Sequence, residues 1–390
     1  MSELPPALLG RHYRTGELVM LTVQDGRVTG VDRPVGQPAI GGPDCWLAPG
    51  LVDVQVNGFQ GHDVNSPEVT PDEIVALVHA LWQTGVTHFC PTVTTGSFER
   101  MSRACAAIAA ACEADPAVDH AVLAIHVEGP YIAPEDGPRG AHPRAHVRPP
   151  SYAEFRRLQD AARGRIGLLT LAPEQPGALE FIGRLTDEGI VVSLGHHAAN
   201  SEQIAAATRA GARLCTHLGN GAHAVLPRHP NYIWDQLAED GLWASIIVDG
   251  HHLPPAVVRC FTRAKGLERL ILVSDAVAPG GLPPGRYAQM DREVELSPDG
   301  RLSLVGTPYL AGAARPLIDG VANLRHFADV SLADALEAAA HQPARLLSAA
   351  DRVGDVVVGA PADLVVLRDE GPNLIAVATV TRGKVVYSIT

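Results

Sequence analysis

The chain has 390 residues, 46% of them hydrophobic, and a formal net charge of −12. This length suits one large domain with an ample core plus a smaller one, and the acidic balance argues against a nucleic-acid surface. No apolar run approaches the about 20 residues of a membrane span, and no signal-peptide pattern follows Met1. The six cysteines form no CxxC pair, so we expect a cytoplasmic protein with buried free thiols and neither nucleic-acid nor membrane partners.

The two ends of the chain differ from its middle. Residues 1–49 alternate apolar and polar side chains, as in LVMLTVQDGRVTGV, and residues 354–390 do the same in DVVVGAPADLVVLRD and VATVTRGKVVYSI. This alternation predicts antiparallel strands with one buried face. Because such a face needs a cover, we expect the two ends to form one small β-sandwich domain, separate from a catalytic domain over residues 50–353.

Eight short apolar runs lie between these ends. They are LVDVQVN (51–57), THFCPTV (87–93), AVLAIHVEG (121–129), GLLTLAP (167–173), VVSLGHH (191–197), LCTHLGN (214–220), ASIIVDG (244–250) and LILVSDA (270–276). Amphipathic segments separate them, for example 71–85, 151–164 and 201–212. Strands that are apolar on both faces and alternate with helices predict a parallel sheet, and eight such units close a (β/α)8 TIM barrel. A doubly wound open sheet is the alternative, but no Gly-rich nucleotide turn follows the first run.

Polar residues stand where these runs end, which is where such barrels carry their chemistry. Glu128 follows the apolar run AVLAIHV, and burying a carboxylate there without a partner would cost several kcal/mol. His196 and His217 end the fifth and sixth runs. One Glu and two His on neighbouring strands would leave a fourth position open for water, as in catalytic zinc sites. We therefore predict one divalent metal ion, preferably zinc, held by these three residues.

Two carboxylates end the last two runs. Asp275, after the eighth run, would face the metal site across the barrel mouth and could pass a proton from water to a leaving amine; a loop-capping role is the alternative. Asp249, after the seventh run, could equally hold a loop backbone or touch substrate. Other histidines near strand ends are more easily explained as hydrogen-bonded side chains than as ligands: His197, His223, His229 and His251.

Longer motifs extend almost from end to end: APGLVDVQVNG, HVEGPYIAPEDGPRGAHP, SLGHHAAN, THLGN, IIVDGHH, LVSDA, LAGA, HQPARLL and VGDVVVGAPADLVVL. They resemble those of the amidohydrolase superfamily and, within it, the N-acetylglucosamine-6-phosphate deacetylase family. The resemblance implies hydrolysis of N-acetylglucosamine-6-phosphate to glucosamine-6-phosphate and acetate, in amino-sugar catabolism. Many superfamily members carry His-x-His in the first strand and bind two metals. This chain has Gln55 and Asn57 there, as vestigial second-metal positions of the one-metal branch.

The resemblance also implies roles for individual residues. The metal ligands would be Glu128, His196 and His217, with Asp275 as the acid and base. The implied contacts to an N-acetylated, phosphorylated amino sugar are Ala141, His142, Asn220, Gly221, Leu310 and Gly312. The phosphate would lie against His252 and Arg228, with the arginine reaching in from the other subunit of a homodimer.

One stretch departs from the family pattern. After the second metal histidine the family usually reads HLFNAM, whereas this chain reads HLGNGAHAVLPRHPN. The substrate loop is therefore remodelled, and a deacetylase or deacylase of another N-acylated sugar or amino acid, with the same single-metal mechanism, is the alternative function. A non-catalytic assembly module is a third hypothesis, but such relatives typically lose metal ligands, and this chain keeps all three.

Overall fold

The computed structural model describes residues 7–36, 38–289, 292–307 and 309–389. An eight-stranded parallel sheet forms its centre, in the order β14-β13-β12-β11-β10-β9-β8-β5. The strands are β5 (Leu51–Val56), β8 (Val86–Thr94), β9 (Ile125–Glu128), β10 (Ile166–Leu171), β11 (Val191–Leu194), β12 (Leu214–Cys215), β13 (Trp243–Ile247) and β14 (Leu270–Val273). Each predicted run overlaps one of them.

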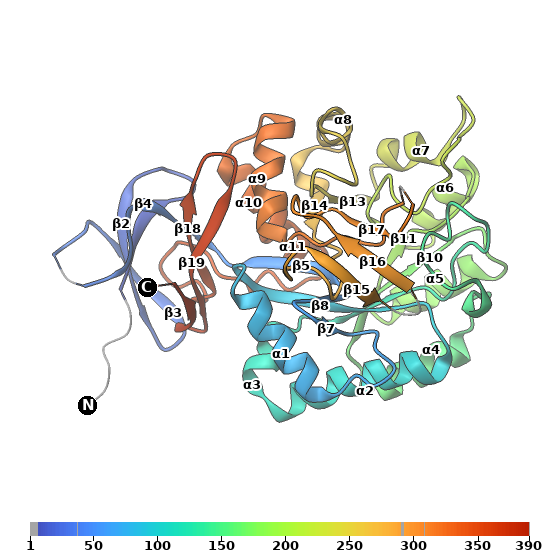
Figure 1. The fold of residues 1–390 in the computed structure, drawn as a ribbon, viewed down its shortest axis with the longest axis horizontal. Coiled ribbons are helices and arrows are strands. Elements are labelled where there is room, and N and C mark those ends of the chain that lie inside the picture. Colours follow the sequence, from blue (N-terminus) through green and yellow to red (C-terminus); the bar gives the residue numbers. More distant parts are fainter. Residues whose placement is uncertain (1–6, 37, 290–291, 308, 390) are drawn as a thin grey trace.

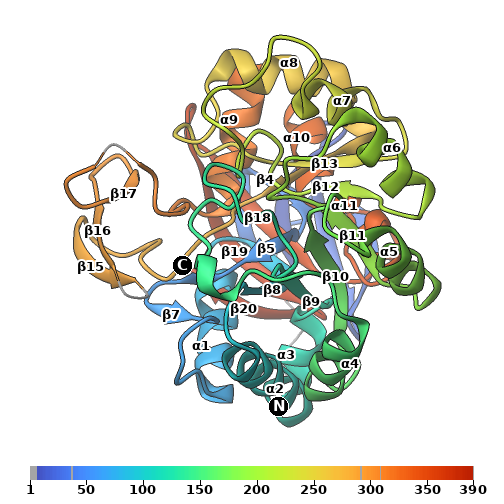
Figure 2. The same ribbon diagram turned by 90° about the vertical axis from the view of Figure 1, so that its right-hand side faces the viewer.

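The two edges of this sheet meet and nearly close the barrel. Val56 and Ala276 form a parallel bridge, and the backbone N–H of Asp275 donates to the carbonyl of Gln55 at 3.0 Å. Figure 2 looks along the barrel, with helices arranged around its strands. The predicted barrel is confirmed, and its closure lies at the carboxyl ends of β5 and β14, where the polar residues gather.

Helices follow the strands in the expected alternation. They are α1 (Pro71–Trp82), α2 (Phe98–Ala114), α3 (Pro116–Ala121), α4 (Tyr152–Ala161), α5 (Ala178–Asp187), α6 (Ser201–Arg209), α7 (Tyr232–Ala238), α8 (Pro255–Lys265), α9 (Leu317–Ala328), α10 (Leu332–Ala339) and α11 (His341–Leu346), with 3-10 turns at Arg144–His146 and Leu267–Arg269. Side-chain caps set where some of them begin. Thr70 accepts from the N–H of Glu73 ahead of α1, and Asn200 and Gln203 form a reciprocal capping box at α6. The third predicted strand is shorter than its apolar run, because α3 continues to Ala121.

Both ends of the chain join one seven-stranded sheet, in the order β20-β19-β18-β4-β1-β2-β3. Its strands are β1 (Leu8–His12), β2 (Leu18–Gln24), β3 (Arg27–Asp32), β4 (Ile40–Pro49), β18 (Leu364–Asp369), β19 (Leu374–Thr381) and β20 (Lys384–Ser388). Figure 1 shows them gathered beside the barrel. The expected sandwich is thus one continuous hydrogen-bonded sheet. It is also mixed, because after β3 the chain crosses to the free side of β1, where β4 pairs in parallel. The predicted domain boundaries at residues 49/50 and 353/354 stay a prediction.

Two small antiparallel sheets belong neither to the barrel nor to the terminal sheet. The strands β6 (Gly58–Phe59) and β7 (His62–Asp63) pair after β5, and β15 (Gly285–Gln289), β16 (Arg292–Leu296) and β17 (Leu302–Leu304) follow β14. The β15–β17 sheet projects from the barrel rim (Figure 2). Its strands are short and half exposed, so they leave no apolar run for a sequence reading to find.

The cysteines and the helices test two further expectations. All six cysteines are free; five are buried as expected, but Cys260 on the outer helix α8 is exposed. In the described part of the chain, no helix combines the length and the hydrophobicity that crossing a membrane requires.

Candidate active site

Three buried side chains converge at the carboxyl ends of neighbouring barrel strands. Glu128 ends β9, and His196 and His217 lie two residues beyond β11 and β12. The Nε2 atoms of the two histidines are 3.2 and 3.0 Å from Glu128 Oε1 and 3.0 Å from each other. Ligands around one zinc ion at bond lengths near 2.0 Å would stand about 3.3 Å apart. This group is therefore arranged to hold a single metal ion.

The backbone of this site is held in an uncommon conformation. His196, His217 and Asp275 have φ values of +52°, +31° and +52°, in the left-handed region that non-glycine residues rarely adopt. Such strain persists where the surroundings enforce it and is concentrated at functional sites. Here it turns each side chain at the point where its strand ends.

Neighbouring groups orient His196 and Glu128. The Nδ1–H of His196 donates to the carbonyl of Pro138 at 2.8 Å, which leaves the Nε2 lone pair for the metal position. Gln55 donates to Glu128 Oε1 at 2.9 Å. Burial by itself raises the pKa of Glu128, but the contacts with the His196 and His217 rings outweigh it and hold that pKa well below its usual range. A divalent metal ion between these closely spaced electron-rich atoms would offset their mutual repulsion.

Asp275 lies in the same cavity and is prepared to accept a proton. Asn57 donates to its Oδ1 at 2.7 Å, which leaves the other carboxylate oxygen for chemistry. Burial, reinforced by the charge of Glu128, raises the pKa of Asp275 to about 6. A carboxylate with a pKa near neutrality can take up a proton and release it again.

A cavity of about 280 Å³ opens above these groups. Most of the predicted site residues line it: Asn57, Glu128, Ala141, His142, His196, His217, Asn220, Gly221, His252, Asp275, Leu310 and Gly312. Gln55 lies beneath Glu128 and does not line it. Arg228 is exposed and is also absent from the walls. No ion pair of Arg228 is present among the described residues, and its predicted phosphate contact stays a prediction.

His142 lies directly over the three-residue group. Its Nε2 is 3.2 Å from the Nε2 of His196 and 3.8 Å from Glu128 Oε2. Burial, together with the nearby His196, lowers the pKa of His142 to about 3, so the ring is neutral. A neutral imidazole here could contact the carbonyl of a bound amide.

The loop after β13 resolves the two readings of Asp249. Its Oδ1 accepts from the backbone N–H groups of His251 and His252 at 2.8 and 2.9 Å, and its Oδ2 lies 2.7 Å from His252 Nδ1. Burial raises the pKa of Asp249, but these bonds, led by His252, lower it to about 2. Asp249 therefore holds the loop and aims His252, whose Nε2 is left for the cavity.

The other histidines near strand ends take no part in the cluster. His197 packs against Tyr232, His223 is hydrogen-bonded to the Tyr232 hydroxyl, and His251 contacts the carbonyl of Asp299. Among the described residues, only one other group could hold a metal, and it lies elsewhere.

The sequence analysis does not predict several cavity residues, among them Asp63, Asn65, Thr94 and Gln289. Thr94 ends β8 and could have been found by the same strand-end rule. Its Oγ1 lies 3.1 Å from Asn65 Oδ1. Gln289 comes from the unexpected β15, and nothing in the sequence pattern indicates that this sheet borders the cavity.

A parallel barrel with a His/His/Glu group and a carboxylate at its mouth is the architecture of a metal-dependent hydrolase. The chain belongs to the amidohydrolase family, whose model matches residues 46–388.

Several relatives of this chain are deacetylases of phosphorylated amino sugars. The chain is 31% identical to N-acetylglucosamine-6-phosphate deacetylase of Bacillus subtilis, over 94% of this chain and 92% of the relative. It is 32% identical to N-acetylgalactosamine-6-phosphate deacetylase of Escherichia coli, over 82% and 83% of the two chains. Among solved structures, a mutant N-acetyl-D-glucosamine-6-phosphate deacetylase of Mycobacterium smegmatis in complex with N-acetyl-D-glucosamine-6-phosphate superposes with a TM-score of 0.85, at 29% identity over 98% of this chain and 99% of the other.

Proposed function

We propose that this chain hydrolyses the N-acetyl amide of N-acetylglucosamine-6-phosphate, giving glucosamine-6-phosphate and acetate. The observation that carries this proposal is the convergence of Glu128, His196 and His217 beside Asp275 in one cavity. Deacetylases of phosphorylated amino sugars are among its relatives over most of the chain, and this supports the choice of substrate.

One divalent metal ion, which we take to be zinc, would be held by Glu128, His196 and His217. When bound, it supplies Lewis-acid activation of water and of the amide carbonyl. Gln55 and Asn57 occupy the first-strand positions where two-metal relatives carry histidines, and amides are poor replacements for imidazoles. Gln55 donates a hydrogen bond to Glu128, and Asn57 donates one to Asp275. The two amides therefore position these carboxylates, although they no longer serve a second metal.

The side chains of the chain perform the proton transfers and the orientation. Asp275 accepts a proton from the attacking water and returns it to the amine as the C–N bond breaks. Asn57 keeps one oxygen of Asp275 engaged, so the other faces the reaction. His142, neutral and above the metal position, would contact the acetyl group.

The phosphate would be bound by two hydrogen-bond donors, an imidazole and a guanidinium. Asp249 holds Nδ1 of His252, so Nε2 of this ring is available to the phosphate. Arg228 is exposed on the loop after β12, and we propose a homodimer in which it reaches the neighbouring cavity. A cytoplasmic location stays a prediction from the sequence.

One assay tests the proposal: acetate release from matched substrates by the metal-loaded enzyme. The panel contains N-acetylglucosamine-6-phosphate, N-acetylgalactosamine-6-phosphate, unphosphorylated N-acetylglucosamine and an N-acetyl amino acid. We expect the highest kcat/KM for the first. The galactosamine epimer is the second candidate, favoured by the altered loop over residues 219–231 and by the Escherichia coli relative. Preference for the unphosphorylated sugar or the amino acid would contradict the proposal.

A further inference from the structure

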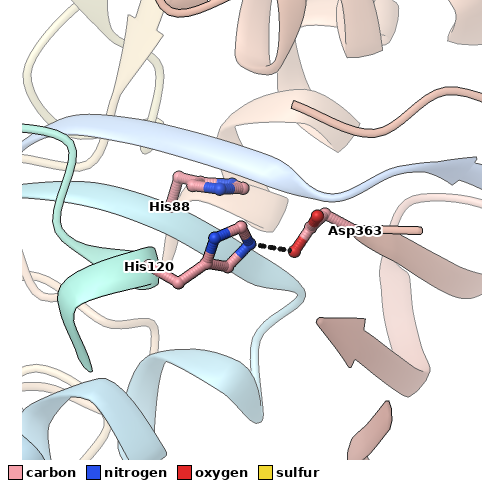
Figure 3. A group of neighbouring side chains, drawn as sticks. All are labelled: His88, His120 and Asp363. Atoms are coloured by element: carbon pink, nitrogen blue, oxygen red, sulfur yellow. Dashed lines mark hydrogen bonds and ion pairs between the residues drawn. The ribbon is translucent and has the colours of Figure 1, made fainter. Parts of the chain in front are cut away.

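A second group of metal-ligating side chains lies where the barrel meets the terminal sheet. His88 lies near the start of β8, His120 near the end of α3, and Asp363 just before β18. Figure 3 shows the two imidazole rings one above the other, with the Asp363 carboxylate facing them. One ligand atom from each lies within 4.8 Å of the other two. Three segments far apart in sequence thus present the donor set that divalent transition metals prefer.

Two atoms of this group are buried without a partner. His88 and Asp363 are both 0% exposed, and neither His88 Nε2 nor Asp363 Oδ2 has a hydrogen-bond partner. His120 Nε2 and Asp363 Oδ1 are 2.7 Å apart, and the N–H of Arg382 also donates to this oxygen. Buried polar atoms are rarely left unpaired, and a shared ligand would satisfy both of these.

The neighbours of His88 fix which of its nitrogens is free. Thr87 Oγ1 donates to the carbonyl of Leu51 at 3.4 Å, so it can accept from His88 Nδ1–H at 3.0 Å. The proton then lies on Nδ1, and Nε2 keeps a bare lone pair. Burial also lowers the pKa of His88 to about 3, so the ring stays neutral. A neutral imidazole with its other nitrogen donating is the form that ligates metals.

We propose that His88, His120 and Asp363 bind a divalent cation, with zinc as the fitting class, and that this ion ties the barrel to the terminal sheet. The ligand atoms must close from as far as 4.8 Å to about 3.3 Å, the spacing of a tetrahedral zinc site. A surface cavity lined by His120, Arg352 and Arg382 borders the group on its His120 side, so only this ligand lies next to solvent.

The surroundings predict that this site is weaker than the first and structural. Arg352 is held by the carbonyls of Asp119 and His120 at 3.3 and 3.1 Å, and its charge opposes a nearby cation. The group also lies at the amino ends of the barrel strands, the face that serves stability instead of catalysis. The bound ion therefore contributes to stability and leaves the deacetylation rate unchanged.

Metal content tests the site without depending on activity. The whole chain is equilibrated with excess zinc, desalted, and its zinc measured by elemental mass spectrometry, for wild type, His88→Gln, Glu128→Gln and the double variant. We expect two zinc ions per chain in wild type, one in each single variant and none in the double. His79→Gln, at an exposed histidine on α1, is the matched control and should keep both.

Thermal unfolding gives an independent readout. Zinc should raise the Tm of Glu128→Gln, in which the second site alone is intact, and should not raise that of the double variant. If His88→Gln does not fold, His120→Gln must lose the same one ion. Wild type that never exceeds one zinc, or variants of His88 and His120 that keep two, would overturn the proposal.

Discussion

The two clusters have nearly the same composition, two histidines and one carboxylate, yet they occupy opposite ends of the barrel. In the first, Glu128 lies 3.0 and 3.2 Å from the imidazole nitrogens, a cavity lies above it, and Asp275 is beside it. In the second, the ligand atoms lie up to 4.8 Å apart, and one histidine is already paired with Asp363. Donor type alone therefore does not define a reaction centre. A preformed spacing, an open cavity and a nearby proton acceptor do.

The largest expected effect of a single substitution is at the first cluster. Glu128→Gln keeps the shape of the side chain but removes the charge that balances a divalent ion. We expect both the catalytic metal and acetate release to fall below detection. Elemental analysis and an acetate assay on the same preparation would check this. An active Glu128→Gln enzyme would contradict the assignment of catalysis to the first cluster.

The next largest loss of turnover is expected at Asp275, where catalysis can be separated from metal binding. Asp275→Asn retains size and the contact with Asn57 but cannot accept a proton. We expect kcat to fall by about 10²–10⁴, with zinc content and KM little changed. Steady-state kinetics on the zinc-loaded variant would measure it. Near-normal turnover would rule out Asp275 as the proton shuttle.

A smaller effect is expected at Gln55, which donates a hydrogen bond to the metal ligand Glu128. Gln55→Leu removes the hydrogen bond to Glu128 Oε1 and should weaken metal affinity by about 10–100-fold. Competition with a zinc chelator would measure the affinity, and saturating zinc should restore most of the turnover. Unchanged affinity would mean that Gln55 fills space and does not orient Glu128.

The phosphate contact should show a substrate-selective effect. Arg228→Ala removes a bidentate donor to phosphate, so KM for N-acetylglucosamine-6-phosphate should rise about ten-fold while KM for the unphosphorylated sugar stays the same. Kinetics with both sugars provide the internal control. Equal effects on the two would remove Arg228 from the phosphate site.

The smallest effect on turnover is expected at the second cluster. Asp363→Asn replaces a buried carboxylate that His120 contacts at 2.7 Å, and a broken charged hydrogen bond should cost about 1–3 kcal/mol in the free energy of unfolding. Urea unfolding in the presence of a chelator would measure this loss without metal binding. Turnover of the folded, zinc-loaded variant should equal that of wild type; a large loss would assign the second cluster to catalysis.

The sequence predicts the barrel and the convergence of the first cluster, because strand ends are visible as apolar runs that stop at polar residues. Glu128, His196, His217 and Asp275 all obey this rule. It cannot predict the carbonyl of Pro138 behind His196, because that contact depends on the path of a loop.

The second cluster is hidden from the same reading. His88, His120 and Asp363 lie near the start of a strand, the end of a helix and the entrance to the terminal sheet. No periodic pattern joins them, and only tertiary packing brings them together. The β15–β17 sheet is missed for another reason, since its half-exposed strands have no continuous apolar run.

The most direct test of the contrast between the clusters is a zinc titration of the metal-free enzyme, followed by acetate release from N-acetylglucosamine-6-phosphate. We predict that activity reaches its plateau at one zinc per chain, at the same level in wild type and His88→Gln, because only the first cluster serves the reaction. A plateau that requires two zinc ions per chain, or that falls in His88→Gln, would contradict this conclusion.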